Sequence, residues 1–286
     1  MRNLTETNLV DTVIAAMSGA KDARFKELMT SLIKHLHAFI REVNLSEAEW
    51  LAGIQFLTAV GQKCDEKRQE FILLSDTLGA TTMKDLINNR KPPGTTEYTI
   101  LGPFYRTDAP ELPPSASISG NLPGEPVIVR GHVLSADHSP IANARIDVWQ
   151  SDAEGAYDMQ MPNINGTALR GVFHTDGDGN YIFRSIKPAC YPVPSDGPVG
   201  QMLVAMGRHP YRPAHVHFMI SAAGYKSVTT ELFVEGDAYL DSDVVFGVRE
   251  SLIVPFVRND FKEEAARLGI SAPFFTVDYD FVLEPA

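Results

Sequence analysis

Up to about residue 90, apolar side chains recur every three or four positions, which is the spacing of one face of a helix. Ser46 and Glu49 form an S-x-x-E capping pattern, so a new helix is predicted to begin there. A further helix is predicted between Glu66 and Ile87, and the sequence Lys91–Gly94 (KPPG) ends the helical pattern. The stripe of the first long predicted helix consists of Phe25, Leu28, Met29, Leu32, Ile33, Leu36, Ile40 and Val43.

Beyond this break the apolar period changes to two, the spacing of a β-strand with one buried face. Strands are predicted at 127–133, 145–150, 181–186, 215–221, 229–234 and 275–283. We expect a mainly β protein in which residues 1–97 form a helical dimerisation part and residues 98–286 an antiparallel, transthyretin-like β-sandwich that carries the catalysis. The segment Pro188–Gly200 has four prolines and two glycines, so it is interpreted as an ordered functional loop.

Composition narrows the choice of partner and compartment. The chain has 36 acidic against 25 basic residues and a formal net charge of −11, which disfavours nucleic acid and anionic membranes as partners. No uncharged apolar run approaches the roughly 18 residues of a membrane span, and the first residues lack the order of a signal peptide. Two cysteines, Cys64 and Cys190, cannot form a disulfide framework. A cytoplasmic protein is therefore expected.

The string His209–Phe218 (HPYRPAHVHF) carries the first sign of chemistry. On a strand, residues i and i+2 share a face, so His215 and His217 can reach one metal ion while Val216 points to the core. Two half-buried histidines satisfied by neighbours, or a zinc hydrolase, are the alternatives. No carboxylate follows at a usual ligand spacing, and Glu231 is fourteen residues after His217.

Tyrosines are the other candidate ligands. Tyr157 follows a strand and a turn, and Tyr191 begins the Pro-rich loop. Most tyrosines only pack, and a phenol with a pKa of about 10 becomes a ligand only where a highly charged cation removes its proton. Ferric iron is such a cation.

Several motifs in order give the sequence a resemblance to a known family. They are Leu101-Gly102-Pro103-Phe104-Tyr105, Ile146–Gln150 leading to Gly155-Ala156-Tyr157, Tyr191-Pro192-Val193-Pro194 followed by Asp196-Gly197-Pro198, and Arg212–His217. Over nearly its whole length the chain resembles the intradiol ring-cleavage dioxygenases, enzymes that open catecholic rings with O2. The helical N-terminal part resembles the catechol and hydroxyquinol branch of that family.

The resemblance implies one Fe(III) per chain, held by Tyr157, Tyr191, His215 and His217. It also implies that Tyr191 leaves the metal when the substrate binds and helps to take up the substrate protons. Arg212 matches the arginine that stabilises charge developing on the ring, with a surface ion pair as the alternative reading.

A carboxylate in a predicted apolar helix indicates which diol is the substrate. Asp76 needs a polar partner in such a setting, and the third hydroxyl of hydroxyquinol can provide one, whereas catechol cannot. Asp76 resembles the hydroxyquinol-cleaving members, although a capping or bridging role is the alternative. Glu231 stands where the family has a glutamine, which leaves its role beside the metal open. The residues expected to line the substrate pocket are Leu73, Asp76, Ile100, Leu101, Gly102, Pro103, Phe104, Val193, Pro194, Arg212 and Val245.

We therefore expect cleavage of hydroxyquinol (benzene-1,2,4-triol) by O2 to 3-hydroxy-cis,cis-muconate, the enol form of maleylacetate. Catechol or a chlorocatechol is the alternative substrate, and a transthyretin-like binding module without chemistry is the alternative of another class. The surplus of apolar helical surface predicts a homodimer. The resemblance adds a phospholipid bound between the two subunits.

Overall fold

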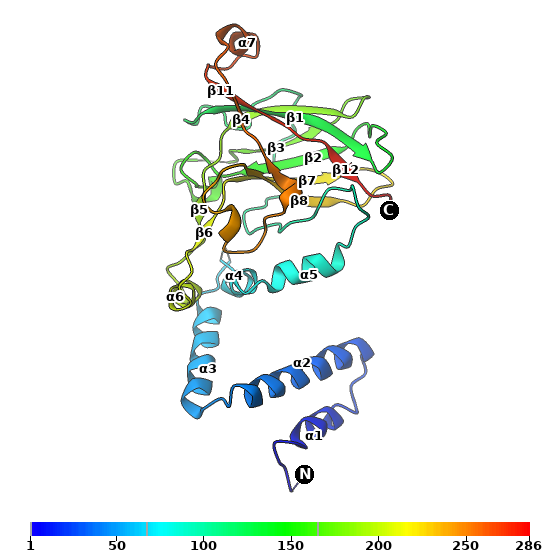
Figure 1. Cartoon of the computed structure of the whole chain (residues 1–286), viewed down its shortest axis with the longest axis vertical. Helices are drawn as coiled ribbons and strands as arrows, with labels where there is room; N and C mark the ends of the chain where they lie inside the picture. Colours follow the sequence, from blue (N-terminus) through cyan, green and yellow to red (C-terminus); the bar gives the residue numbers. More distant parts are fainter. Residues whose placement is uncertain (1, 67, 165) are drawn as a thin grey trace. The chain divides into compact units, whose positions relative to one another are not determined.

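The computed structural model describes residues 2–66, 68–164 and 166–286. It divides into two compact units, Met1–Gln62 and Lys63–Ala286. The first unit consists of helices α1 (Leu9–Ala16), α2 (Ala23–Glu42) and α3 (Glu47–Gln62) (Figure 1). The predicted cap precedes α3: the Ser46 N–H donates to Glu49 Oε2 at 2.9 Å, and the Glu49 N–H donates to Ser46 Oγ at 3.3 Å. The predicted start of this helix is confirmed.

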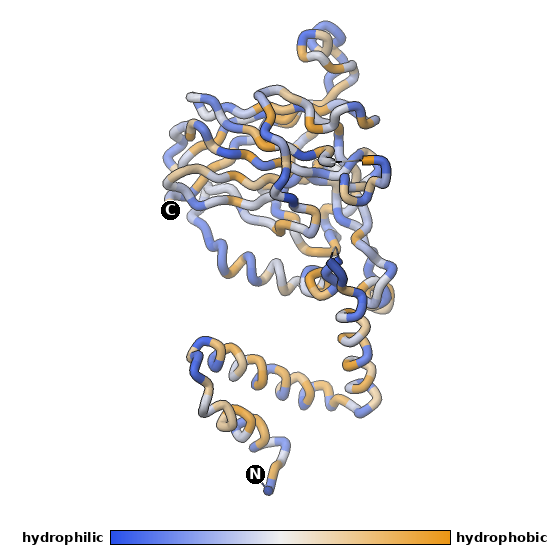
Figure 2. Tube along the Cα trace, turned by 180° about the vertical axis from the view of Figure 1, so that it is seen from behind, coloured by the Kyte–Doolittle hydropathy of each residue, from blue (hydrophilic) through white to orange (hydrophobic). Residues whose placement is uncertain are grey.

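Large apolar side chains of this helical unit remain exposed. None of the described residues of α1 or α2 is buried, although apolar positions recur along α2 (Figure 2). The exposed set includes Phe25, Leu28, Leu32, Leu36, Phe39, Ile40 and Val43 on α2, and Trp50, Leu51, Ile54 and Leu57 on α3. A helix gains most of its stability by covering its apolar face, so these helices present a surface suited to a further partner.

The second unit begins with two helices where one was expected. Helix α4 (Glu70–Thr77) and helix α5 (Ala80–Asn88) are separated at Gly79, whose φ of +74° is left-handed and cannot continue a helix. Residue 67, within the predicted helix, lies outside the described residues. The turn at Gly79 ends α4 directly after Asp76 and Thr77.

Two five-stranded sheets make up most of this unit. The first contains β10 (Val257–Asn259), β11 (Phe274–Asp278), β1 (Pro126–Ser135) and β12 (Phe281–Leu283), and β4 (Asn180–Ile186) also pairs with β1. The second has the order β3 (Arg170–His174), β2 (Arg145–Gln150), β7 (His215–Ser221), β8 (Val228–Val234) and β9 (Ile253–Val254). Short elements connect them: η1 (Asp158–Gln160), η2 (Leu240–Ser242), η3 (Glu250–Leu252) and α7 (Lys262–Arg267).

The hydrophobic core lies between the two sheets (Figure 1). Phe218 of β7 packs against Phe183 of β4 and Phe281 of β12, with ring centroids 6.1 Å and 4.9 Å apart. This is the predicted sandwich, since alternate residues of each strand face inward. Three strand pairs are parallel and not antiparallel as predicted, namely β1 with β11, β1 with β12, and β8 with β9. In each pair the later strand runs beside an earlier one in the same direction.

Two local predictions were wrong. Pro188–Gly200 is not only loop: it contains strand β5 (Tyr191–Pro192), which pairs with β6 (Tyr211–Arg212), and the start of helix α6 (Pro198–Ala205). Proline suits the first turn of a helix, where its missing N–H costs nothing, so Pro198 begins α6. The predicted strand 275–283 is divided into β11 and β12, and between them the exposed Asp280 carboxylate accepts the N–H of His132 at 2.8 Å. Among the described residues, no helix combines the length and apolar character needed to cross a bilayer.

Candidate active site

The two histidines of β7 lie on the face of the sheet opposite the core. Val216 and Phe218 belong to the core cluster, so the alternation of a strand directs His215 and His217 to the other side. His217 is paired with Trp149 of β2 and with Glu231 of β8 in the strand register. The ladder thus fixes His217 from two sides, and it fixes His215 through its pairing with Phe233 of β8.

Tyr157 reaches the histidines through a tight turn after β2. The Asp152 carboxylate accepts the backbone N–H groups of Glu154 and Ala156 at 2.9 Å and 2.8 Å, which closes the turn. Gly155 has a φ of +88°, and a Cβ added there would lie 2.7 Å from Cβ of Tyr191. Only glycine allows the turn to pass this closely, so the same residue brings both tyrosines together.

The side-chain ends of Tyr157, Tyr191, His215 and His217 converge on one point in the interior. Tyr157 and both histidines are at most 1% exposed, and Tyr191 is 5% exposed. The Tyr157 hydroxyl lies 3.3 Å from that of Tyr191, 3.4 Å from His215 Nε2 and 3.1 Å from His217 Nε2. His215 Nε2 lies 3.1 Å from His217 Nε2 and 3.4 Å from the Tyr191 hydroxyl. We call these four side chains the donor cluster.

The imidazoles of the donor cluster are neutral, and the lone pair of His215 Nε2 points into the cluster. His215 Nδ1 lies 2.7 Å from the Pro213 carbonyl, which can only accept, so Nδ1 carries the proton and Nε2 is an acceptor. Burial lowers the pKa of His215 to about 4 and lowers that of His217 well below its usual value. Burial also raises the pKa of both phenols, that of Tyr157 well above its usual value. The phenols therefore keep their protons unless a strong cation is present.

The spacing and chemistry of the donor cluster fit a metal ion. Ligand atoms that share one metal at about 2.0–2.2 Å lie on the order of 3–3.5 Å from one another, as the phenol oxygens and imidazole nitrogens do here. Two phenolates and two neutral imidazoles suit a hard trivalent ion, because phenolate charge offsets most of the cation's charge. The set therefore has the donors that ferric iron needs.

Glu231 is close to both histidines but is already engaged. Its Oε1 lies 3.4 Å from His215 Nε2 and 3.4 Å from His217 Nδ1, and these three side chains form a possible metal-binding group. Both its oxygens accept from Arg212, Oε1 from Nη1 at 2.7 Å and Oε2 from Nη2 at 3.1 Å. Burial raises the pKa of Glu231, but the Arg212 charge outweighs it and holds the pKa below its usual value. Glu231 is therefore held beside the histidines by a two-point ion pair with Arg212.

A pocket opens onto the donor cluster, since Tyr191 and Arg212 form part of its wall. Its described lining consists of Arg68, Gln69, Ile72, Leu73, Asp76, Ile100, Gly102, Pro103, Phe104, Tyr191, Val193, Pro194, Arg212 and Val245. Leu101 lies outside this lining: it is 41% exposed and lines a neighbouring pocket together with Asp76 and Ile100. Burial raises the pKa of the Asp76 carboxyl, which is 7% exposed.

Sequence reasoning missed part of this wall. Gln69 at the N-cap of α4, and Ile72 and Asp76 within the helix, are spaced by three and four residues, so helical periodicity starting from Asp76 would have found them. It also missed Asp243, whose carboxylate accepts from Arg212 Nε and Nη2, both at 3.2 Å. Asp243 is thirty-one residues from Arg212 in the sequence, and no local pattern connects them.

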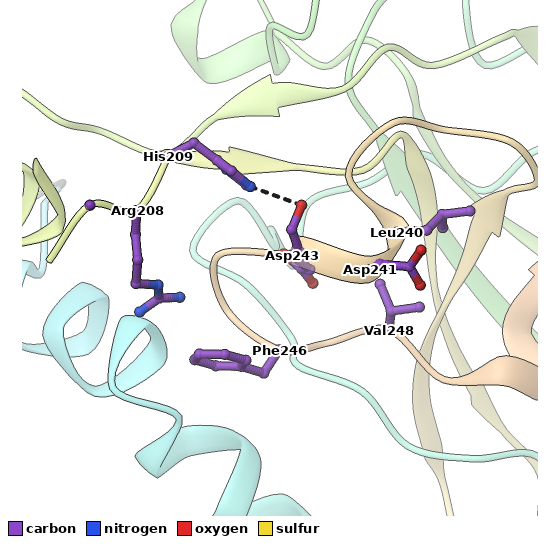
Figure 3. Close-up of a pocket in the computed structure, with 9 residues that line it drawn as sticks. Arg208, His209, Leu240, Asp241, Asp243, Phe246 and Val248 are labelled. Carbon is purple, nitrogen blue, oxygen red and sulfur yellow. Dashed lines mark hydrogen bonds between the residues drawn. The ribbon is translucent and has the colours of Figure 1, made fainter.

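A second pocket includes Asp243 in its wall (Figure 3). It is lined by Gly207, Arg208, His209, Leu240, Asp241, Ser242, Asp243, Phe246 and Val248. His209 Nε2 is hydrogen-bonded to Ser242 Oγ at 2.9 Å, and Arg208 donates to the carbonyls of Thr77 and Val244 at 2.6 Å and 2.8 Å. These bonds join the segment after α6 to α4 and to the loop that follows η2.

Comparison with known proteins agrees with this fold and shows the family. Residues 100–285 match the family model described as Dioxygenase, and residues 22–96 match the one described as Catechol dioxygenase N terminus. The chain therefore belongs to the intradiol ring-cleavage dioxygenase family, whose members use non-haem iron and O2 to open the rings of aromatic diols.

Individual relatives cover almost the whole chain. It is 50% identical over 280 residues to a hydroxyquinol 1,2-dioxygenase from Rhizobium sp., covering 97% of this chain and 95% of that protein. It is 47% identical to a 6-chlorohydroxyquinol 1,2-dioxygenase from Cupriavidus pinatubonensis, covering 100% and 99%. The solved structure of a hydroxyquinol 1,2-dioxygenase from Pseudomonas putida DLL-E4 superimposes with a TM-score of 0.93 at 44% identity, covering 98% and 99%.

Proposed function

We propose that this enzyme cleaves hydroxyquinol between its two adjacent hydroxyl-bearing carbons, with O2, to give 3-hydroxy-cis,cis-muconate and hence maleylacetate. The observation that carries the proposal is the position of Asp76 in the wall of the pocket that reaches the donor cluster. A substrate whose two adjacent hydroxyls face Tyr191 has its remaining ring positions toward the pocket wall, where a third hydroxyl can donate to Asp76. The names of the relatives support the same substrate.

Under this proposal one Fe(III) per chain is held by Tyr157, Tyr191, His215 and His217. Ferric iron bound there supplies the Lewis acidity that activates a catecholic dianion toward O2. The two imidazoles serve as neutral donors, and burial of the phenols keeps water from competing for the site. Tyr191 lines the pocket, and in this proposal it would give way to the substrate and accept a substrate proton.

The other pocket residues orient and shield the ring. Arg212 is charged: burial opposes its charge, but Asp243 and Glu231 hold the pKa well above its usual value. Its Nη1 lies 3.2 Å from His215 Nε2, so a positive charge faces the place where negative charge develops on the ring. Phe104 stacks on Tyr157 with ring centroids 4.3 Å apart, and Val193 and Val245 add apolar wall. An apolar wall strengthens each charge interaction inside it.

The proposal also covers the assembly. We infer a homodimer formed through the helical part, residues 1–97, because α2 and α3 leave their large apolar side chains exposed. A phospholipid between the subunits, expected from the family resemblance, would cover the remaining apolar surface. A cytoplasmic location accords with the low cysteine content.

An oxygen-uptake panel tests the substrate. Hydroxyquinol, catechol, chlorocatechols and protocatechuate are compared at equal concentration, and the product is identified by mass spectrometry. We expect hydroxyquinol to have the highest kcat/KM. A higher kcat/KM for catechol or a chlorocatechol would overturn the assignment of the substrate and leave the enzyme class intact.

A further inference from the structure

Arg212 is surrounded by two carboxylates that fix its orientation. Its guanidinium has five N–H groups. Nε and one N–H of Nη2 donate to Asp243, at 3.2 Å each. The other N–H of Nη2 and one of Nη1 donate to Glu231, at 3.1 Å and 2.7 Å. Four of the five N–H groups are therefore used, and the fifth, on Nη1, is the one directed at the donor cluster, 3.2 Å from His215 Nε2.

Asp243 is itself held in place by the backbone. Its Oδ1 accepts the N–H of Val245 at 3.3 Å, and its Oδ2 accepts the N–H of Gly247 at 2.9 Å. Each carboxylate oxygen thus accepts one bond from the loop and one from Arg212. Since Val245 also lines the substrate pocket, this one carboxylate connects the pocket wall to the guanidinium.

The space around this arrangement is fully used. Arg212, Glu231 and Asp243 are all at most 4% exposed. A Cβ added at Gly247 would lie 2.8 Å from Arg212 Nη2, 3.0 Å from Asp243 Oδ2 and 3.2 Å from Glu231 Oε2. The first of these separations is too short for any carbon, so a side chain at position 247 would have to move the guanidinium.

We propose that Asp243 is a positioning residue for ring cleavage: with Glu231 and the unsubstituted Gly247, it holds Arg212 so that a single N–H faces the reacting ring. This inference rests on the proposed role of the donor cluster and of Arg212. Asp243 does not touch the substrate, and it acts only through the arginine. A group that is already oriented needs no reorganisation as charge develops on the ring, which is where an electrostatic contact gains most of its effect.

Asp243→Asn is the direct test, with Asp241→Asn as the matched control. The amide places an N–H donor where Arg212 and a backbone N–H both need an acceptor. Asp241→Asn makes the same change of charge two residues earlier, at an exposed position of η2. We expect Asp243→Asn to lower kcat by about 10²-fold with little change in KM, and Asp241→Asn to match the wild type. Iron content and melting temperature are measured on each variant, and the diol that the wild type turns over fastest is the substrate.

A double-mutant cycle separates positioning from a merely structural role. If Asp243 acts through Arg212, Asp243→Asn has no further effect on kcat in the Arg212→Gln background. The visible band of the anaerobic substrate complex should also shift in the same direction in Asp243→Asn and Arg212→Gln. An unchanged kcat in Asp243→Asn, or the same loss of kcat in both backgrounds, would overturn the proposal.

Gly247→Ala provides an independent variant that removes no charge. We expect it to retain iron and to lose kcat as Asp243→Asn does, because the added methyl group displaces the guanidinium. Wild-type kcat in an iron-replete Gly247→Ala would overturn the proposal even if Arg212→Gln does not fold. Failure of the proposed function would appear differently, as wild-type enzyme without iron or without hydroxyquinol-dependent oxygen uptake.

Discussion

Trp149 and His217 stack face to face, with ring centroids 4.7 Å apart and planes inclined by only 6°. The two residues are direct neighbours in the register of β2 and β7. Trp149 is 1% exposed, whereas Trp50, the second tryptophan of the chain, is 53% exposed on α3. The indole that touches the donor cluster can therefore be distinguished from the other one by its environment.

Trp149 should report on metal loading. In a Trp50→Phe variant, whose only indole is Trp149, we expect the fluorescence to be strongly quenched in the iron-loaded enzyme, because a coloured ferric site in contact accepts the excitation energy. Emission should rise after the iron is reduced and removed with a chelator, and fall again when iron is restored. The fluorescence of the Trp149→Phe variant serves as the control. Equal emission with and without iron would place the metal away from His217.

The purified protein should contain about one Fe(III) per chain and be red to brown through phenolate-to-iron charge transfer. His215→Ala and His217→Ala should each lose most of the iron and the visible band, since each removes one of four donors. Elemental analysis and the visible spectrum measure both effects. A colourless protein replete with iron would contradict tyrosine ligation.

Asp76→Ala should lower kcat/KM for hydroxyquinol far more than for catechol. A lost hydrogen bond to a charged acceptor corresponds to roughly 1.5–3 kcal/mol, or on the order of 10–150-fold. Catechol offers no hydroxyl to this largely buried carboxylate, so its turnover should hold steady or rise. Oxygen uptake with the two substrates gives the ratio, and iron content serves as the folding control. Equal losses of kcat/KM on both substrates would mean that Asp76 supports the fold and does not select the substrate.

The helical part should make the protein a dimer at micromolar concentration. Leu32 is 57% exposed on α2, and Leu32→Glu places a charge on the apolar stripe, so we expect it to weaken the dimer. Lys34→Glu changes an exposed position about 200° away around the helix and should leave the assembly unchanged. Light scattering measures both variants. A monomeric wild type would reject the dimer.

Periodicity explains why some of this site could be predicted from the sequence. A period of two along 215–221 was enough to place Phe218 in the core and both histidines on one opposite face. Periodicity could not identify the tyrosines as ligands, because Tyr157 follows a turn and Tyr191 begins a strand of only two residues, so the ordered motifs of the family were needed. Asp243 and Gly247 had no local signal, since their contacts with Arg212 depend on how a distant loop folds back.

The predicted helix boundaries were wrong where a single residue outweighed the apolar pattern around it. The apolar spacing from Glu66 to Ile87 continues through Gly79, yet its left-handed backbone separates α4 from α5. In Pro188–Gly200 the density of prolines concealed the start of α6, although Pro198 stands at a favourable position for a first helical turn. Composition averages over such positions and cannot identify them.

The two histidines of the donor cluster and most of the pocket wall are built on different kinds of scaffold. His215 and His217 stand on a central strand, paired on both sides, whereas Asp76, Val193 and Val245 belong to a short helix and to loops. Substitutions in the wall can therefore change which ring fits without altering the ladder that holds the histidines. Selection, natural or in the laboratory, can in this way explore new aromatic substrates by small steps while the oxygen chemistry is inherited intact.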